Sequence, residues 1–162
     1  LLDLSRMDSE VPVLRELVDL SAVAEKSIPV LRPLAEHRNV DLRLEAESEV
    51  LVCASEDDLY QIVFNLAENA IKYNVPHGEV TVSVKKRDGA AVLTVADTGI
   101  GIPKEDLDHV FERFYRVDKS HSKEIGGTGL GLSIVKHGAK FHNAYVSIDS
   151  TLGEGTTVRI LF

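Results

Sequence analysis

The chain has 162 residues, 44% of them hydrophobic, which suits one compact domain with a substantial core rather than a disordered chain. Its formal net charge of −8 argues against nucleic acid as the main partner, and none of its apolar runs reaches the roughly 20 residues that span a bilayer. Its single cysteine, Cys53, lies in an apolar run, so we expect a buried small hydrophobe in a reducing compartment rather than a nucleophile.

The beginning of the chain has the spacing of a helix. Leu1, Leu4 and Met7 would share one helical face, but a helix of this length is not stable alone. We expect the end of a longer helix that begins upstream, although a frayed tail would have the same pattern.

A strand and a long helix are predicted next. The strand covers residues 12–19, and the helix runs from Ser21, a favourable N-cap, to about Asn39. Because Pro29 and Pro33 lie inside this helix, we expect it to be kinked or broken there.

A second helix follows two short strands, which are predicted over residues 40–46 and 50–54. Ser55 and Asp58 have the spacing of a helix-capping pair, and the helix that they open runs to about Asn74. This helix connects the strands to the part of the sequence that carries the most information.

The second helix has a polar row that a core helix would not need. At about 3.6 residues per turn, one face carries Asn65, Asn69, Lys72 and Tyr73. The other face is an ordinary buried stripe made of Leu59, Ile62, Val63, Leu66 and Ala70. Two carboxamides one turn apart, followed by a cation and a phenol, indicate a helix that lines a site for a metal-chelated phosphate.

The clearest strand signal in the sequence is a hairpin. Residues 79–87 and 90–97 alternate apolar and polar side chains around Asp88 and Gly89, a dipeptide typical of two-residue hairpin turns. We therefore expect two adjacent antiparallel strands.

The last part of the chain is predicted to be a long loop, a helix and two strands. Residues 98–128 are charged and rich in glycine, and so long a loop in a compact domain is usually functional, often a lid. A helix over about 129–141 and strands over 144–150 and 156–162 follow. Helices that alternate with mostly antiparallel hairpins predict a two-layer α/β sandwich, with one sheet face covered by helices and the other solvated.

Asp97 ends a predicted strand and opens a short motif with two glycines. A carboxylate can accept a hydrogen bond from an exocyclic amine, such as that of adenine. Gly99 and Gly101 would let the backbone approach a flat ring, and Ile100 and Ile102 would supply apolar contact. A plain turn would explain the isolated motif equally well.

A glycine-rich stretch over residues 126–131 precedes the last predicted helix. Its backbone N–H groups and the helix start would favour anionic oxygens, although the stretch is neither a Walker loop nor a dinucleotide fingerprint. Upstream, residues 111–116 place three aromatic side chains in the loop, where we expect them to anchor a lid while Arg113 and Arg116 reach inward. Beside a phosphate loop, we expect Arg116 to contact phosphate.

The order of these four motifs resembles the N, G1, F and G2 boxes of the histidine-kinase catalytic domain, in the GHKL ATPase superfamily. The resemblance covers about residues 12–162, and the run from Asp118 to His137 most resembles kinases of the phosphate-sensor type. It implies the Bergerat ATP-binding fold, an α/β sandwich with a mixed, mostly antiparallel sheet, helices on one face and an ATP lid. Residues 1–10 would be the remnant of the second dimerisation helix, and residues 11–162 the catalytic domain.

The resemblance also implies a ligand set. Asn69 would coordinate the Mg²⁺ that bridges the ATP phosphates, with Asn65 beside it on metal or phosphate. Lys72 and Arg116 would be the catalytic residues, and Arg116 would neutralise charge on the transferred γ-phosphoryl group. Tyr73 would touch phosphate or ribose. At the adenine, Asp97 would make a direct contact and Thr156 a contact through water. The residues around the ring and the phosphates would be Gly99, Ile100, Gly101, Ile102, Arg113, Gly127, Thr128, Gly129, Leu130 and Gly131.

One position separates kinases from their hydrolytic relatives in this superfamily. There, a glutamate four residues before the metal asparagine activates water, whereas this chain has Asn65, which cannot act as a general base. Glu68 lies about 100° around the helix from Asn69 and does not replace that glutamate. We therefore expect ATP to be held without rapid hydrolysis, for an external nucleophile.

That nucleophile is expected on another domain. The family phosphorylates a histidine followed by an acidic residue, and none of the six histidines here has that context. The resemblance thus implies an excised, monomeric ATP-binding half of a bacterial kinase. Its partners would be ATP, the upstream dimerisation domain and, indirectly, a response regulator. We expect the fragment to be cytoplasmic and its parent to be a membrane protein.

Two other functions fit the same superfamily. A stand-alone GHKL module, such as an anti-sigma serine kinase or binding protein, would lack an upstream phosphoacceptor helix. A hydrolytic GHKL ATPase is disfavoured by Asn65. The aromatic and arginine segment favours the histidine-kinase interpretation.

Overall fold

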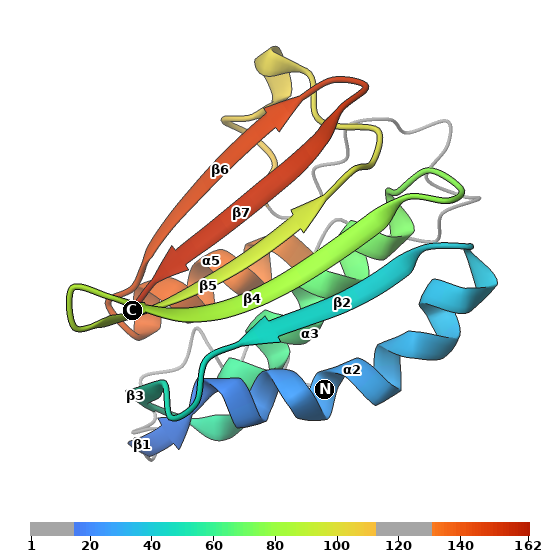
Figure 1. Ribbon diagram of the computed structural model, residues 1–162. Helices are drawn as coiled ribbons and strands as arrows, with labels where there is room; N and C mark the ends of the chain where they lie inside the picture. The colour runs from blue at the N-terminus through green and yellow to red at the C-terminus, as the bar shows by residue number, and fades with distance from the viewer. Residues whose placement is uncertain (1–14, 113–130) are drawn as a thin grey trace.

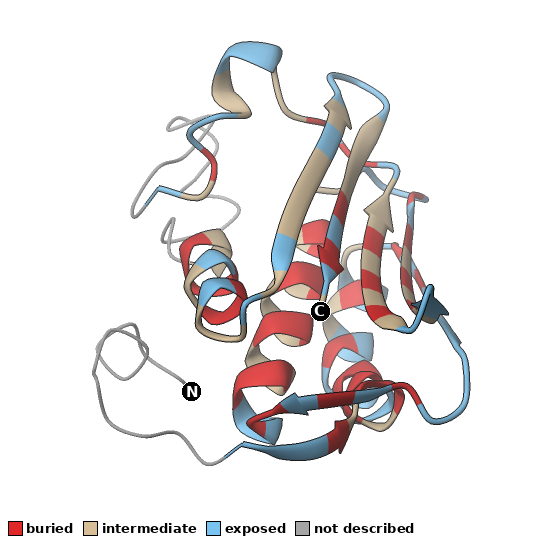
Figure 2. Cartoon of the chain, turned by 90° about the vertical axis from the view of Figure 1, so that its left-hand side faces the viewer, coloured by how far each residue is buried: buried red, intermediate tan, exposed pale blue. Residues whose placement is uncertain are grey.

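The computed structural model describes residues 15–112 and 131–162, and these form a two-layer α/β sandwich (Figure 1). Within these two ranges, a five-stranded sheet lies over three helices, and the buried residues lie between the two layers (Figure 2). The helices are α2 (Leu20–His37), α3 (Glu56–Lys72) and α5 (Gly131–Phe141). The predicted sandwich is therefore confirmed.

The large sheet is mixed and mostly antiparallel, as predicted. Its strand order is β2-β4-β5-β7-β6, where β2 pairs with β4 in parallel and every other neighbour is antiparallel. The strands are β2 (Asp41–Ala46), β4 (Glu79–Arg87), β5 (Ala90–Asp97), β6 (Tyr145–Thr151) and β7 (Gly155–Leu161). A 3-10 turn, η1 (Lys104–Asp106), follows β5 in the predicted loop.

The β4–β5 hairpin has the predicted bounds at both strands. Arg87 pairs with Ala90, so only Asp88 and Gly89 lie in the turn, and both have a positive φ, of 51° and 80°. Two consecutive left-handed residues match the right-handed twist of the flanking strands. The apolar residues of β4 alternate into the core, as the pattern predicts.

Helix α2 differs from the prediction in its cap and its continuity. Its N-cap is Asp19, whose Oδ1 accepts the backbone N–H of Ser21 at 3.0 Å, rather than Ser21 itself. The helix continues through Pro29 and Pro33, so it is not broken there, and the kink that we expected as the alternative stays a prediction. Both prolines lie on the exposed face one turn apart, where water can satisfy the carbonyls that lose their N–H donors, while Leu31 holds the opposite face in the core.

A second, two-stranded sheet joins β1 (Glu16–Asp19) to β3 (Leu51–Ala54). In β3, Val52 and Ala54 are buried and alternate with exposed Leu51 and Cys53. The prediction of a buried Cys53 is therefore wrong. A strand places neighbouring side chains on opposite faces, so an apolar run need not be buried throughout.

The core is one cluster between the sheet and the helices. Its largest fully buried side chains include Leu20, Leu31, Leu59, Ile62, Ile71, Leu93 and Ile160. The predicted buried stripe of α3 lies in this cluster. In the described ranges, no helix combines the length and apolarity that crossing a bilayer would require.

Candidate functional site

One polar row lies at an edge of the buried sheet face, where β5 and β6 end and β7 begins. The last apolar cross-strand row consists of Val95, Val158 and Ile148. The next row on the same face, two residues later in β5 and β6 and two residues earlier in the antiparallel β7, consists of Asp97, Thr156 and Ser150. The core thus gives way to a polar surface where β5, β7 and β6 meet.

The Asp97 carboxylate in this row has one oxygen held by the protein and one left over. Oδ1 accepts the backbone N–H of Gly99 at 2.9 Å and that of Thr156 at 3.2 Å. Oδ2 accepts no hydrogen bond from a residue in the described ranges. Burial raises the pKa of the Asp97 carboxyl above its ordinary value, and the two N–H donors partly offset that rise. The arrangement suits an acceptor for a ligand amine.

The predicted glycine motif after Asp97 is held between α3 and the β6–β7 turn. Ile100 donates its N–H to the Tyr73 carbonyl at 3.1 Å and accepts the N–H of Gly153 at 2.8 Å. A Cβ on Gly99 would lie 2.4 Å from the Tyr73 carbonyl oxygen, so this close approach requires glycine. Gly101 has a φ of +73°. The Ile100 side chain is 42% exposed and can contact a ring.

The two carboxamides of α3 face the start of α5. A Cβ on Gly131 would lie 3.2 Å from Asn69 Nδ2 and 3.6 Å from Asn65 Oδ1. Asn65 Nδ2 donates to the Gln61 carbonyl at 2.7 Å, which leaves Oδ1 as the atom on the side of Gly131. The structure therefore brings together the asparagine pair and the end of the glycine-rich stretch, as the four-motif interpretation requires.

Lys72 and Tyr73 lie between these two groups of residues. Lys72 Nζ forms an ion pair with Glu68 Oε1 at 3.3 Å, one turn away on α3. Tyr73 is the C-cap of α3, and its carbonyl accepts the Ile100 N–H. The backbone of Tyr73 thus links the carboxamide helix to the glycine motif, a role that the sequence motifs do not predict.

The chemistry of the donor set fits magnesium bound together with a phosphate ligand. Across residues 15–112 and 131–162, no group of three acidic, histidine or cysteine side chains could hold a metal by itself. The carboxamide oxygens of Asn65 and Asn69 would supply one or two ligands, and Mg²⁺ usually takes the others from phosphates and water. A site of this kind is incomplete without its phosphate.

The aromatic segment of the predicted lid begins beside α5. Phe111, the first aromatic of the segment, has its ring centroid 5.9 Å from Lys136 Nζ. The predicted ligands Arg113, Arg116, Gly127, Thr128, Gly129 and Leu130 lie outside the described residues. Their roles stay predictions.

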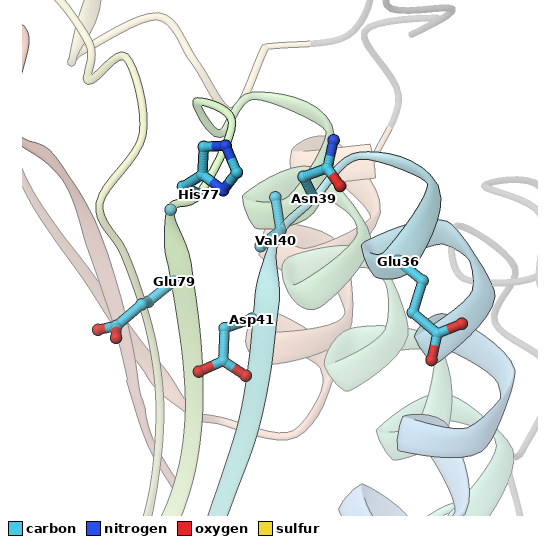
Figure 3. Close-up of a pocket in the computed structure, with 7 residues that line it drawn as sticks. Glu36, Asn39, Val40, Asp41, His77 and Glu79 are labelled. Carbon is cyan, nitrogen blue, oxygen red and sulfur yellow. The ribbon is translucent and has the colours of Figure 1, made fainter.

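A hollow elsewhere on the surface lies between the end of α2, β2 and the turn before β4 (Figure 3). The carboxylates of Glu36, Asp41 and Glu79 point in different directions there (Figure 3). His77 donates its backbone N–H to the Asn39 carbonyl at 2.7 Å, which closes the junction of the two segments. We regard this hollow as a structural junction rather than a ligand site.

Ser150 and Glu68 belong to the site but were not among the predicted ligands. Ser150 could have been found from the alternation of β6, which places it on the same face as Val146 and Ile148. Glu68 could have been found from its spacing of four residues from Lys72. From the sequence, the only role to test for Glu68 is that of a general base, which its angle from Asn69 excludes.

Comparison with known proteins identifies histidine kinases both from sequence and from structure. The profile of the family described as "Histidine kinase-, DNA gyrase B-, and HSP90-like ATPase" matches residues 54–162. The sensor-like histidine kinase SenX3 of Mycolicibacterium smegmatis is 38% identical over 159 residues, which are 97% of this chain and 41% of that protein. The sensor histidine kinase YkoH of Bacillus subtilis is 38% identical over 163 residues, which are 100% of this chain and 35% of that protein.

Two solved structures have the same fold. The mycobacterial sensor histidine kinase MprB superposes with a TM-score of 0.78 at 30% identity, over 92% of this chain and 97% of that one. Full-length ShkA in complex with AMPPNP superposes with a TM-score of 0.81 at 25% identity, over 97% of this chain and 33% of that one. The chain therefore corresponds to less than half the length of the curated relatives SenX3 and YkoH.

Proposed function

This chain belongs to the family of histidine kinase-, DNA gyrase B- and HSP90-like ATPases, and on that basis we propose that it binds Mg-ATP as the catalytic domain of a two-component sensor histidine kinase. The family that the four motifs indicated is confirmed by the profile match and by the sensor histidine kinases among the relatives. The role of each residue, the metal and the phosphoryl acceptor are our proposals.

The observation that supports ATP is the distribution of polar groups along one path. At one end, Asp97 Oδ2 is available to the exocyclic amine of adenine, beside the apolar side chain of Ile100. At the other end, Asn65 and Asn69 face Gly131 at the start of α5, where a triphosphate would find carboxamides and a helix N-terminus. Tyr73 connects the two ends through its carbonyl.

The residues at the phosphate end suit transfer to another molecule rather than hydrolysis. Mg²⁺ held by Asn69 and Asn65 would neutralise charge on the phosphates. Asn65 offers no carboxylate to take a proton from water, so the γ-phosphoryl group would stay on ATP until a stronger nucleophile arrives. Lys72, which forms an ion pair with Glu68, would contact the phosphates.

The reaction that we propose moves the γ-phosphoryl group to a histidine of a separate dimerisation domain. The bond between the γ-phosphorus and the β,γ-bridging oxygen breaks, a bond from phosphorus to an imidazole nitrogen forms, and ADP and the imidazole proton leave. A response regulator would then receive the phosphoryl group from that histidine. On this proposal the domain works on the cytoplasmic side, where ATP is available.

The experiment combines calorimetry with transfer of label. The chain should bind Mg-ATP, acquire no label from γ-labelled ATP, hydrolyse it slowly, and label a separately made dimerisation domain on histidine. Rapid hydrolysis by the chain alone would favour a hydrolytic ATPase, and label on a serine of a partner would favour the anti-sigma type. Either result would overturn the proposal.

A further inference from the structure

The hydroxyl of Ser150 makes three contacts at the edge of the candidate site. Its Oγ accepts the backbone N–H of Ile102 at 2.8 Å, donates to the Gly155 carbonyl at 3.0 Å, and lies 2.7 Å from the Thr156 hydroxyl. A serine hydroxyl has one proton and two lone pairs, which suffice for all three when Thr156 donates to Ser150. Its hydrogen-bonding capacity is therefore fully used.

These contacts lead directly to the base-recognition end of the site. Ile102 belongs to the glycine motif that follows Asp97, and Ser150 gives the N–H of Ile102 an acceptor. Thr156 lies between Ser150 and Asp97 in the cross-strand row, and its N–H donates to Asp97 Oδ1. Ser150 thus holds the neighbours of the carboxylate on two sides without touching the carboxylate.

We propose that Ser150 is a positioning residue for base specificity, which rests on the proposed function of the same site. By fixing Ile102 and Thr156, the Ser150 hydroxyl keeps Asp97 Oδ2 directed at the exocyclic amine of the purine. Loss of the hydroxyl would let the glycine motif and Thr156 shift, and the distance from Oδ2 to the amine would become poorly defined. The loss of affinity would come from the contact with the amine rather than from the contacts with the phosphates.

A merely structural role for Ser150 gives a different result. If the hydroxyl only ties β6 to β7, its removal would lower the stability of the hairpin and weaken every nucleotide equally. A nucleotide that lacks the amine separates the two cases, because it has nothing to lose at Asp97. Purine riboside triphosphate is such a nucleotide.

The experiment measures the affinities of Mg-ATP and of Mg-purine riboside triphosphate by calorimetry on the full chain. The variants are Ser150→Ala, Ser150→Thr, which keeps the hydroxyl, and Ser147→Ala, a matched control on the opposite face of β6. We expect Ser150→Ala to weaken ATP about five- to tenfold and the analogue less than about twofold. Ser150→Thr should retain most of the wild-type affinity for ATP, and Ser147→Ala should bind both nucleotides like the wild type.

Four results would overturn the inference. Equal losses for both nucleotides in Ser150→Ala would assign the hydroxyl a structural role, and unchanged ATP affinity would assign it none. If Ser150→Ala fails to fold, Ser150→Thr decides, because ATP selectivity lost in spite of a retained hydroxyl contradicts the inference. A wild-type chain that binds no Mg-ATP would reject the proposed function and this inference together. The wild-type titration thus distinguishes failure of the proposed function from failure of this inference alone, in which the wild type binds Mg-ATP.

Discussion

The Asp97 carboxylate accepts the backbone N–H of Thr156 at 3.2 Å, although the two residues are 59 positions apart in the chain. Gly99 donates to the same oxygen, Oδ1. The two donors determine which oxygen faces the protein and leave Oδ2 for a ligand. Recognition of an amine at this site therefore depends on the pairing of β5 with β7 as well as on the charge of Asp97.

The Asp97→Asn variant should change base preference. Both N–H donors need an acceptor, so the asparagine oxygen would take the place of Oδ1 and its NH₂ group the place of Oδ2. That group would repel the amine of adenine and match the oxo group of hypoxanthine. We expect Mg-ATP affinity to fall about 10- to 100-fold and Mg-ITP to bind more tightly than Mg-ATP. Calorimetry with both nucleotides tests this, and an unchanged preference for ATP contradicts it.

Asp97 should also lower the stability of the nucleotide-free domain at neutral pH. Burial raises the pKa of its carboxyl, so ionisation costs more free energy in the folded chain than in the unfolded chain. The protonated carboxyl makes its full contribution to stability at pH values below the pKa of the unfolded chain, about 3.9. That contribution is lost as the pH rises through the raised pKa of the folded chain. Urea unfolding should show Asp97→Asn more stable than wild type at neutral pH, with the difference fading in acid. A difference that does not vary with pH would argue against this cause.

The Asn69→Ala variant should lose metal-dependent binding without unfolding. No residue in the described ranges forms a hydrogen bond with the Asn69 carboxamide, so its removal should move the thermal midpoint by less than about 3 °C. Chelation of Mg²⁺ should weaken ATP binding by the wild type and have little further effect on the variant. Adenosine binding, which needs only the Asp97 end, should survive and serves as the control. Wild-type affinity for Mg-ATP in both Asn69→Ala and Asp97→Ala would refute the site.

Gly99→Ala should lower both stability and ATP affinity because of a steric clash, and the same substitution at Gly89, where there is no clash, serves as the control. The added Cβ would lie 2.4 Å from the Tyr73 carbonyl, so we expect a loss of about 1–3 kcal/mol in the free energy of unfolding and weaker ATP binding. Gly89 has a φ of +80°, and a Cβ added there would have no atom within 4 Å. Gly89→Ala should therefore lower the free energy of unfolding by about 1 kcal/mol through backbone strain and leave ATP binding intact. Urea unfolding and calorimetry on both variants provide the comparison. Gly99→Ala with wild-type affinity would show that the close approach to Tyr73 is not needed.

The thiol of Cys53 should react without denaturant, because the side chain is exposed on β3. One thiol per native chain should be modified by Ellman's reagent, and Cys53→Ser should change the free energy of unfolding by less than about 0.5 kcal/mol. The Ser variant is also the control for the reaction. Modification that occurs only after denaturation would show that Cys53 is protected.

The parts of the fold that local sequence determines were predictable. The β4–β5 hairpin depends on alternation and on the turn residues Asp88 and Gly89. Ser55 caps α3 because its side chain accepts the N–H of Asp58, and its place just before an apolar stripe makes the cap predictable. The four motifs also indicated which segments meet, since Gly131 does face the asparagine pair.

What could not be predicted depends on contacts between distant segments. The cap of α2 is Asp19 because β1 ends there against β3, and the sequence alone favours Ser21 equally well. Continuity through Pro29 and Pro33 reflects the burial of the other face of α2. The alternation of β6 indicates the face on which Ser150 lies, but Ser150 lies beside Thr156 only because β6 pairs with β7 in a particular register, which the alternation does not reveal.

Helix α3 has its apolar stripe in the core and its carboxamides at the candidate site. Inserting one residue before Asn65 would rotate every later side chain by about 100°, displacing the stripe and the carboxamides at once. Substitutions can remove ligand binding and spare folding, but length changes in this helix cannot separate the two. Over evolutionary time, this segment should therefore vary in side-chain identity and keep its length.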